Sequence, residues 1–210
     1  MLELLDGHYG RPQWKPRYAP VDELVYTVLS QNTADVNTAR TFAALTARFP
    51  TWSAARDAPL AEIVAAISLG GLATTKAPRI KQILVAISSR TGEPDLSELD
   101  GMDDEQALAY LQGLPGVGPK TAACVLMFAL GRPAMPVDTH VYRVARRLGL
   151  LAPTTTVEQA HRLLTELAGP QNVYPLHVNL VTHGRRVCHA RQPECSCCPL
   201  AHICPSVFSL

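Results

Sequence analysis

Apolar side chains recur along most of this chain three and four residues apart, and no stretch alternates convincingly between apolar and polar positions. The first spacing is typical of helices that bury one face, whereas alternation would indicate half-buried strands. The pattern therefore predicts an all-α fold. A helix is expected after Pro20, ending near Ser30-Gln31-Asn32-Thr33, with further helices at about 35–48, 60–69, 75–90 and 103–112.

Short motifs mark where helices begin and end. Gly70 and Gly71 are expected to end one helix, since glycine adopts the left-handed backbone that often follows a helix. Thr155 and Glu158 have the spacing of a capping box, which predicts a helix start, and Pro175 is expected to open the last helix.

The stretch from Leu114 reads LPGVGPKTAACVLMFALG and predicts a tight turn that leads directly into an apolar helix. Pro119 suits the first position of that helix, where an N–H would have no partner in the helix. Further along, PVDTHVYRVARRLGL predicts a helix with Asp138 as its N-cap and Gly149 as its end.

Length and composition indicate a folded globular protein. The chain has 210 residues, of which 47% are hydrophobic, and this is enough to bury a core. No run of eighteen apolar residues occurs, and the N-terminal segment lacks a basic stretch followed by an apolar one. Neither a membrane span nor a signal peptide is therefore expected, and the predicted location is cytoplasmic.

The net charge of +1 indicates no particular partner by itself, but its distribution is uneven. Residues 93–105 hold seven acidic side chains, whereas residues 118–150 hold five basic ones and the single acid Asp138. One surface could then attract phosphate groups while another repels them. Both stretches are also typical of ordinary solvated helix faces, and charge alone favours that interpretation.

Five of the six cysteines lie in the last 23 residues. Such clustering without a secretion signal indicates metal binding before disulfide formation. Because the loop from Cys188 to Cys204 has few apolar residues, we expect it to depend on its metal for folding. Cys197 is an additional thiol inside it. The spacing C-x6-C-x2-C-x5-C suits either tetrahedral zinc or a [4Fe-4S] cluster, with Cys188, Cys195, Cys198 and Cys204 as the candidate ligands.

Gly116 and Gly118 flank Val117 in the turn between two predicted helices. Glycines there allow a sharp turn and leave successive N–H groups uncovered, and N–H groups at a helix N-terminus bind phosphate oxygens. Such a hairpin would contact the sugar-phosphate backbone of a nucleic acid without reading base edges. A helix connection that uses its glycines only for turning is the alternative, which the pattern leaves open.

Lys120 stands just inside the N-terminus of the helix after this turn. The positive end of a helix disfavours a second positive charge, so the position favours the neutral, nucleophilic amine. Lys120 is therefore a candidate for Schiff-base formation, and a surface lysine that contacts phosphate is the alternative. Asp138 at the N-cap of its helix is expected to contribute about 1 kcal/mol to stability, and such a cap fixes where the carboxylate points.

Two of these motifs resemble a known family. LPGVGPKTA is similar to the helix-hairpin-helix signature of the endonuclease III family of DNA glycosylases, and VDTHVYRVARRLG is similar to the segment that follows it in that family. Lys120 and Asp138 lie 18 residues apart in this chain. The resemblance runs from about residue 20 to the cysteine loop and so covers most of the chain.

The resemblance implies base-excision repair of duplex DNA that contains damaged bases or abasic sites. Lys120 would attack C1′ of the damaged nucleotide, displace the base and form an imine that permits β-elimination of the 3′ phosphate. Asp138 would accept the proton of the amine or stabilise positive charge on the sugar. The presence of the lysine implies a bifunctional glycosylase and AP lyase for oxidised pyrimidines of the thymine glycol type. The four cysteines would hold a [4Fe-4S] cluster with a structural role.

Two further positions match family residues that fill the gap left by the displaced base. Asn32, in LSQNTAD, matches a position that is commonly glutamine in bacterial relatives, and Leu72, in GLATTKA, matches an intercalating leucine. Core packing at a helix start is the alternative for Leu72. Relatives that remove adenine opposite oxidised guanine carry a carboxylate about one helical turn before the position that Asn32 occupies here. This chain has Thr27 there, so adenine removal is not expected.

The resemblance describes the fold as two lobes. Residues 21–134 would form a six-helix barrel that carries the hairpin, and residues 1–20 with 135–210 would form a second lobe, with the cluster loop at 188–204. We expect a monomer that binds duplex DNA, without a membrane partner, and that is found on the nucleoid when bound. Competing interpretations are a relative with another preference, such as mismatches or abasic sites alone, a non-catalytic DNA-binding module with structural zinc, and a ferredoxin-like electron carrier.

Overall fold

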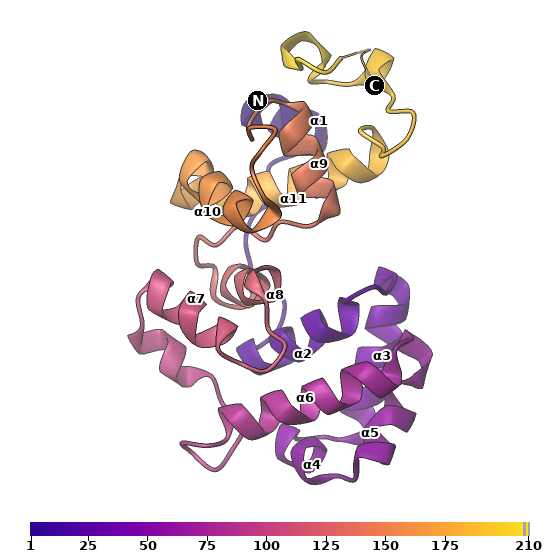
Figure 1. Ribbon diagram of the computed structural model, residues 1–210, viewed down its shortest axis with the longest axis vertical. Coiled ribbons are helices and arrows are strands. Elements are labelled where there is room, and N and C mark those ends of the chain that lie inside the picture. The colour runs from indigo at the N-terminus through magenta and orange to yellow at the C-terminus, as the bar shows by residue number, and fades with distance from the viewer. Residues whose placement is uncertain (208, 210) are drawn as a thin grey trace. The chain divides into compact units, whose positions relative to one another are not determined.

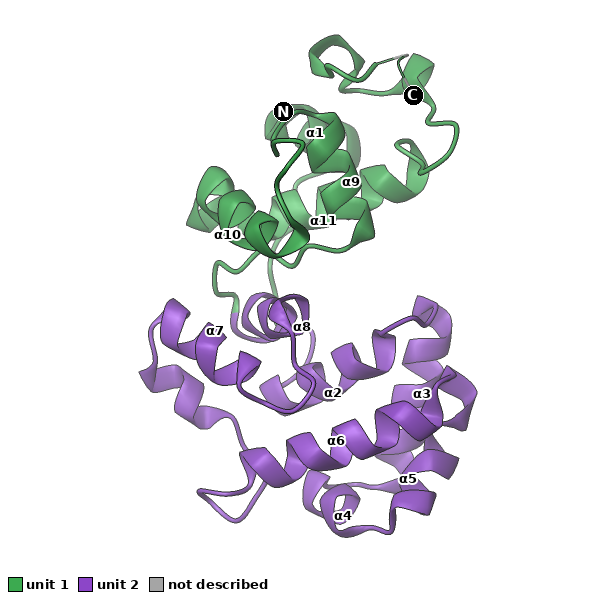
Figure 2. Ribbon diagram, viewed as in Figure 1, with its two compact units in different colours: residues 1–16, 131–210 green, residues 17–130 purple. Residues whose placement is uncertain are grey.

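The computed structural model of this chain describes residues 1–207 and 209, and within them every regular element is a helix (Figure 1). The all-α prediction is therefore confirmed. The chain divides into two compact units, unit 1 with residues 1–16 and 131–210, and unit 2 with residues 17–130 (Figure 2). No helix in the described part of the chain is both long and apolar enough to cross a membrane.

Unit 2 is a group of helices around one apolar core. α2 packs against α3, α6 and α8, and α6 also packs against α4 and α5. Short 3-10 helices, η1 (Ser68–Gly70) and η2 (Ser97–Gly101), precede α6 and α7. The α-helices of this unit are α2 (Pro20–Ser30), α3 (Asp35–Arg48), α4 (Trp52–Asp57), α5 (Leu60–Ala66), α6 (Ala73–Ile87), α7 (Asp104–Gln112) and α8 (Pro119–Cys124).

The core of unit 2 follows the helical spacing of its apolar residues. Leu24 and Val28 lie one turn apart on α2, Ile80 and Leu84 lie one turn apart on α6, and all four are 0% exposed. Burying a side chain of this size stabilises a fold by about 1.5–3 kcal/mol. This core fixes the helices that carry the predicted hairpin and gap-filling residues.

The last helix of unit 2 widens after its first turns. α8 continues as the π-helix η3 (Val125–Ala129), whose carbonyl at Phe128 accepts from the N–H of Arg17 at 3.0 Å. The guanidinium of Arg17 also lies 4.3 Å from the centre of the Phe128 ring. The first and last residues of unit 2 are thereby held against each other.

Unit 1 is assembled from both ends of the chain. α1, α9 and α10 each pack against α11, and Leu5, Leu164 and Leu180 are fully buried among them. α11 begins two residues before Pro175, which was expected to open it. The elements are α1 (Leu2–Tyr9), α9 (Thr139–Arg147), α10 (Val157–Ala168), η4 (Pro170–Asn172), α11 (Val173–Arg186), η5 (Cys195–Cys197) and η6 (Ala201–Ile203).

Most predicted helices of unit 2 are found in place. α2, α3 and α7 begin and end within one residue of the expected bounds. The helix expected at 60–69 ends at Ala66, where η1 follows, and the helix expected at 75–90 covers Ala73–Ile87. The spacing does not predict α1 or α4, since eight and six residues hold too few turns to show a clear pattern.

Two caps of unit 1 show one correct and one wrong prediction. Asp138 is the N-cap of α9, as expected. The predicted capping box of Thr155 with Glu158 is wrong by one residue, because Thr156 and Gln159 form it instead. Thr155 is buried just before the helix, so the threonine that faces outward takes the capping position.

The boundaries between the two units fall after residues 16 and 130. The boundaries expected from the resemblance fall after residues 20 and 134. The roles assigned to the two parts of the chain stay predictions.

Candidate functional site

The turn between α7 and α8 places its two glycines in different conformations. Gly116 has φ +70°, a left-handed backbone that a side chain would strain, whereas Gly118 has φ −93° and open space where a Cβ would stand. Val117 between them is 5% exposed, and its N–H donates to the carbonyl of Leu114 at 3.1 Å. Only Gly116 is therefore needed for turning. Gly118 instead leaves the N-terminus of α8 open to a close approach.

Arg79 of α6 lies directly against this turn. A Cβ at Gly116 would stand 2.4 Å from Nε of Arg79, so the guanidinium fills the space that a larger residue would need. Nη1 of Arg79 donates to Oε1 of Gln31 at 2.7 Å, and Nε2 of Gln31 donates to Oγ1 of Thr121 at 3.3 Å. The turn, the end of α2 and the start of α8 are thereby tied together. Sequence reasoning missed Arg79 and Gln31, since no local motif marks either of them.

Lys120 is the second residue of α8, directly after Pro119, and its side chain is partly buried. The sequence contains four lysines. Lys76 and Lys81 donate to backbone carbonyls, and Lys15 is exposed in unit 1. Among the described residues of unit 2, no side chain forms a hydrogen bond or ion pair with the amine of Lys120. Lys120 is thus the lysine of this unit whose amine is left for a ligand.

Asp138 caps α9 through one carboxylate oxygen. Its Oδ1 accepts from the N–H of Val141 at 2.7 Å, which fixes the direction of the carboxylate. Lys120 belongs to unit 2 and Asp138 to unit 1. The cap is confirmed, and the joint catalytic role of the two residues stays a prediction.

Asn32 and Leu72, the predicted gap-filling residues, lie on two segments of unit 2 that the structure brings together. Both are exposed, Leu72 to 52%, and both have left-handed backbones with φ +51° and +54°. Oγ1 of Thr33 donates to the carbonyl of Gly70 at 2.8 Å and so joins the segments. The exposure of Leu72 rules out core packing, which was the alternative for this residue.

Thr27 serves the core of unit 2. It is 1% exposed and donates from Oγ1 to Oε1 of Glu23 at 3.0 Å. Glu23 is completely buried and forms an ion pair with Arg17. Because the hydroxyl of Thr27 is buried and already bonded, it is not offered to a ligand.

The charged stretches are largely committed to local contacts. In the acidic segment, Glu98 pairs with Arg90, and Asp103 caps α7 by accepting from a backbone N–H at 2.8 Å. In the basic segment, Arg143 and Arg147 donate to backbone carbonyls at the end of α11 and in the cysteine loop. The interpretation of ordinary helix faces is therefore favoured over opposed phosphate-attracting and phosphate-repelling surfaces.

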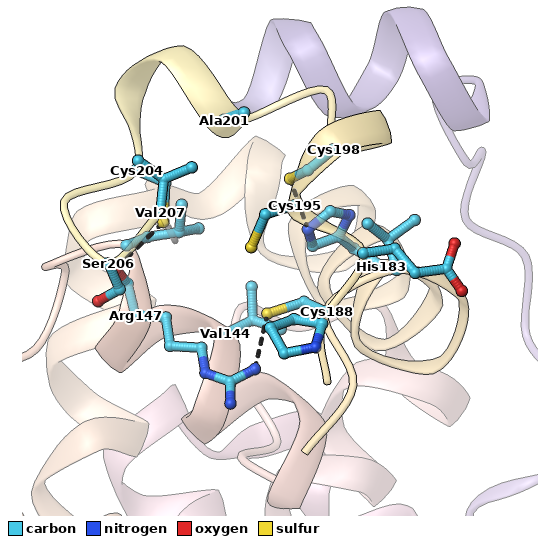
Figure 3. Close-up of a pocket in the computed structure, with 14 residues that line it drawn as sticks. Val144, Arg147, His183, Cys188, Cys195, Cys198, Ala201, Cys204, Ser206 and Val207 are labelled. Carbon is cyan, nitrogen blue, oxygen red and sulfur yellow. Dashed lines mark hydrogen bonds between the residues drawn. The ribbon is translucent and has the colours of Figure 1, made fainter. Parts of the chain in front are cut away.

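One pocket of unit 1 is lined by all four candidate metal ligands: Cys188, Cys195, Cys198 and Cys204. Cys188 lies two residues after the end of α11, Cys195 begins η5, Cys198 follows η5, and Cys204 follows η6. Figure 3 shows the four around a shared space with His183 and Arg147. Cys197 is exposed, and its Sγ lies 3.4 Å from the carbonyl oxygen of Glu194. The structure thus separates the four predicted ligands from the additional thiol.

Hydrogen-bond donors approach the sulfur atoms of this pocket. Nη1 of Arg147 donates to Sγ of Cys188 at 3.3 Å, and the N–H of Leu200 donates to Sγ of Cys198 at 3.4 Å. Such donors stabilise thiolates, which are the ligand form of cysteine. Arg147 also donates to the two carbonyls that follow Cys188, at 2.6 and 3.1 Å. This arginine therefore holds the start of the loop as well as a sulfur atom.

The four cysteines of the pocket could serve two kinds of metal centre. Within the described residues, no group of three or more His, Cys, Asp or Glu side chains is arranged to hold one metal ion. Structural zinc would need four ligand atoms at about 2.0–2.3 Å from one point. Four thiols around a shared space suit a [4Fe-4S] cluster, because its cysteines bind separate iron atoms. The residues present fit that group, and its presence stays a prediction.

The chain matches a known protein family. Residues 25–170 match the HhH-GPD model, which describes a superfamily of base excision DNA repair proteins. The endonuclease III of Synechocystis is 36% identical over 188 residues, which cover 89% of this chain and 81% of the relative. The endonuclease III of Escherichia coli is 32% identical over 187 residues, which cover 89% and 83%. A candidate DNA glycosylase of Arabidopsis thaliana is 39% identical over 165 residues, and the chain spans 56% of its length.

Solved structures show the same fold. A trapped covalent intermediate of endonuclease III with DNA has a TM-score of 0.84 at 27% identity, covering 99% of this chain and 94% of that one. A thermostable thymine-DNA glycosylase has a TM-score of 0.82 at 18% identity, which shows the fold alone, and covers 100% and 95%.

The chain therefore belongs to the HhH-GPD superfamily of base excision DNA repair proteins. Within it, the endonuclease III relatives make this chain an endonuclease III-like DNA glycosylase. The family and the class of enzyme expected from the hairpin and its following segment are confirmed.

Proposed function

We propose that the chain is a bifunctional DNA N-glycosylase and AP lyase that removes oxidised pyrimidines of the thymine glycol type from duplex DNA. The observation that carries this proposal is the position of Lys120, whose amine is left for a ligand within unit 2 beside a hairpin that is open at Gly118. The similar fold of an endonuclease III covalently trapped on DNA supports an attacking side chain. The buried, bonded Thr27 supports the exclusion of adenine as the substrate.

The hairpin holds the DNA backbone in this proposal. The first N–H groups of a helix lack partners within the helix and carry its partial positive charge, so they bind a phosphate oxygen. Gly118 leaves space for the phosphate, and the side chain of Val117 is buried and so holds the turn against the core of unit 2. Asn32 and Leu72 occupy the gap left when the damaged nucleotide swings out of the duplex, a step that requires a few kcal/mol.

Lys120 supplies the nucleophile. Its neutral Nζ bonds to C1′, the bond from C1′ to the base breaks, and the base leaves with that electron pair and a proton. The sugar ring opens to an iminium, loss of a C2′ proton drives departure of the 3′ phosphate, and water releases the lysine. Asp138 takes a proton from the amine or stabilises the positive charge on the sugar. Its bond to Val141 holds the carboxylate in one direction.

The four cysteines of the pocket would hold a [4Fe-4S] cluster. With four protein ligands, the cluster supplies a structural centre for the loop and leaves no open position for a substrate. We place the protein on duplex DNA as a cytoplasmic monomer that is associated with the nucleoid when bound.

The test replaces Lys120 with glutamine. On a duplex with one thymine glycol, the rate of strand cleavage should fall by at least about a thousandfold, and no adduct should be trapped by borohydride. Lys15→Gln, in unit 1, should leave both unchanged. Because the sequence has four lysines, mass spectrometry of the trapped wild-type adduct should assign it to Lys120 alone. An adduct that survives in Lys120→Gln would exclude the proposed nucleophile.

A second test separates the two roles of Asp138. Asparagine caps a helix about as well as aspartate but carries no charge. Asp138→Asn should therefore retain the free energy of unfolding while the rate falls by about 10²–10³-fold. Asp103→Asn, at the N-cap of α7, makes the same chemical change at a cap without an assigned reaction. Equal activity of the two variants would reduce Asp138 to a cap.

If wild-type protein binds DNA in a salt-dependent manner yet leaves every oxidised-pyrimidine duplex uncut, the proposed lesion class is wrong.

A further inference from the structure

The two gap-filling residues share a rare backbone conformation. Three residues other than glycine have positive φ in the described part of the chain, and Asn32 and Leu72 are two of them, with Gln192 the third. A left-handed backbone is strained for most residues with a Cβ; asparagine tolerates it, whereas leucine seldom adopts it. Leu72 is also 52% exposed, so burial of its side chain does not offset that strain. Other contacts must hold these two residues in place.

The carbonyl of Leu72 accepts from the N–H groups of Thr75 and Lys76 at the start of α6, and the side chain of Lys76 makes a second set of contacts beside Asn32. It is 3% exposed, and its Nζ donates to the carbonyl of Leu29 and to Oγ1 of Thr33, both at 2.6 Å. Thr33, which follows Asn32, donates in turn to the carbonyl of Gly70 at 2.8 Å. An ammonium group only donates, so the threonine hydroxyl accepts from Lys76. Its one proton can go to the carbonyl of Gly70 at 2.8 Å or to that of Gln31 at 3.2 Å, and the shorter distance favours Gly70. One buried charge thus links the end of α2 to the segment just before Leu72.

A helix cap alone does not account for this arrangement. Leu29 lies in the last turn of α2, where a cation stabilises the final carbonyls, and an exposed lysine would be sufficient for that. Lys76 is buried instead, and burial lowers the pKa of its amine, which shows that its charge is disfavoured there. The second bond, to Thr33, contributes nothing to α2. It serves the loop that follows.

Gly70, whose carbonyl accepts the bond from Thr33, has little freedom to move. A Cβ on Gly70 would stand 2.6 Å from Oγ1 of Thr41 on α3, so the backbone at Gly70 already lies against that helix. The bond from Thr33 holds the carbonyl of the same residue. Gly70 is therefore fixed two residues before Leu72, and a shift of Thr33 would be passed to both gap-filling residues.

We propose that Lys76 is a positioning residue for base eversion, the step in which the damaged nucleotide leaves the duplex. Through Thr33 it holds Asn32 and Leu72 in their left-handed conformations and at a fixed separation. This inference rests on the proposed function, because it assumes that these two residues enter DNA. Lys76 is buried and does not touch the nucleic acid itself. Misplacement of contact groups by about 1 Å lowers rates by up to about a hundredfold.

The test compares substrates that differ in their need for eversion. Lys76→Met keeps the length of the side chain and removes its donors. Its single-turnover rate on a paired thymine glycol duplex should fall by about 10–100-fold. On the same strand annealed to a complement that lacks the opposite base, the rate should change less than about threefold, because base pairing no longer resists eversion. Trapping on DNA with a preformed abasic site should be retained, since Lys120 is unchanged.

Two further variants separate positioning from stability. Thr33→Val removes the link but leaves the bond from Lys76 to Leu29, so it should reproduce the substrate difference with a smaller loss of stability. Lys81→Met, on the same helix, removes a bond to the carbonyl of Ala58, which is not joined to the gap-filling segments. It should lower both rates in equal proportion or not at all. Thr33→Val carries the test if Lys76→Met does not fold.

A readout without cleavage distinguishes failure of this inference from failure of the proposed function. The DNA carries a tetrahydrofuran abasic analogue opposite 2-aminopurine, whose fluorescence rises when it is unstacked. Saturating wild-type protein should raise that fluorescence, and Lys76→Met and Thr33→Val should raise it less than half as much at saturation. The positioning role is overturned if both variants match the wild type here, or if they slow both lesion substrates equally. A wild type that raises fluorescence but cuts neither lesion substrate overturns the proposed lesion class and leaves the positioning role standing.

Discussion

Unit 2 and the cysteine loop at residues 188–204 are held together by different means. Unit 2 buries apolar side chains on each of its helices, as Leu24 and Leu84 show at 0% exposure. The loop fully buries Leu200, and its other side chains are partly or fully exposed. Stability is therefore spread over many contacts in unit 2 and concentrated on thiols and a few hydrogen bonds in the loop.

This difference indicates how each region should respond to damage. Fixing a backbone costs about 1–2 kcal/mol per residue, which one buried leucine cannot offset over a loop of this length. We infer that the loop is ordered by Arg143 and Arg147, which donate to its first carbonyls, and by the group that its cysteines would bind. Changes in unit 2 should be felt throughout that unit, whereas changes in the loop should stay local.

Removal of a cysteine should have the largest effect. In Cys198→Ser the visible absorbance of an iron-sulfur centre should be lost, and amide exchange in the loop should speed up at least about a hundredfold, because its main support is gone. Amides of α6 should keep their protection, as measured by hydrogen exchange and mass spectrometry. Cys197→Ser, outside the pocket, should change neither. Equal protection of the loop in both variants would show that it is ordered without a bound group.

A cavity in the core of unit 2 should lower amide protection throughout unit 2 and leave the cysteine loop unchanged. Leu84→Ala should lower the free energy of unfolding by about 3 kcal/mol, since Leu84 is completely buried. Val85→Ala, one position along and 53% exposed, should lower it by less than about 0.5 kcal/mol. Denaturant unfolding with exchange at α6 measures both. A loss confined to the neighbouring amides would contradict a cooperative unit 2.

Arg147 should matter to the loop alone. Arg147→Met removes its bonds to Cys188 and to the two following carbonyls, and should destabilise the loop by about 2 kcal/mol. Arg146→Met, at the neighbouring exposed position of α9, is the control and should have no measurable effect. Local exchange free energies of the loop are the measurement. If α6 loses protection as well, the comparison between the regions fails.

The two hairpin glycines should differ by the smallest amount. Gly116→Ala introduces a side chain at φ +70° and against Arg79, so unit 2 should lose about 1–2 kcal/mol. Gly118→Ala adds a methyl group in open space, so stability should be retained while DNA affinity falls where a phosphate would approach. Thermal unfolding and fluorescence anisotropy on duplex DNA measure the two effects. If Gly118→Ala lowered stability and Gly116→Ala lowered only DNA affinity, Gly118 would be the residue needed for the turn and Gly116 the one that leaves space for DNA.

Features written into local sequence were predictable. Helical spacing was sufficient for α2, α3 and α7, and short-range cap chemistry placed Asp138 correctly. The same chemistry failed at Thr155 because two adjacent threonines satisfy the pattern, and only packing decides which of them faces outward. The four cysteines could be grouped from their spacing, since ligand type and separation are local properties.

Features made by tertiary contacts were not predictable. Gln31 meets Thr121 across 90 positions of the chain, and Lys76 meets Thr33 across 43, so no window of sequence displays either pair. The left-handed backbone of Leu72 is equally invisible, because leucine has no preference for it. The sequence identified the residues expected to meet DNA, and the structure shows what holds them.

The backbone N–H of Arg17 donates to the carbonyl of Phe128, so the chain enters and leaves unit 2 at neighbouring positions. A segment whose two ends lie close together can be excised, or its ends can be linked, without distorting its own fold. Residues 17–130 should accordingly fold as an excised fragment. Joining their ends through a short glycine linker should allow new termini to be opened at an exposed loop without loss of the fold.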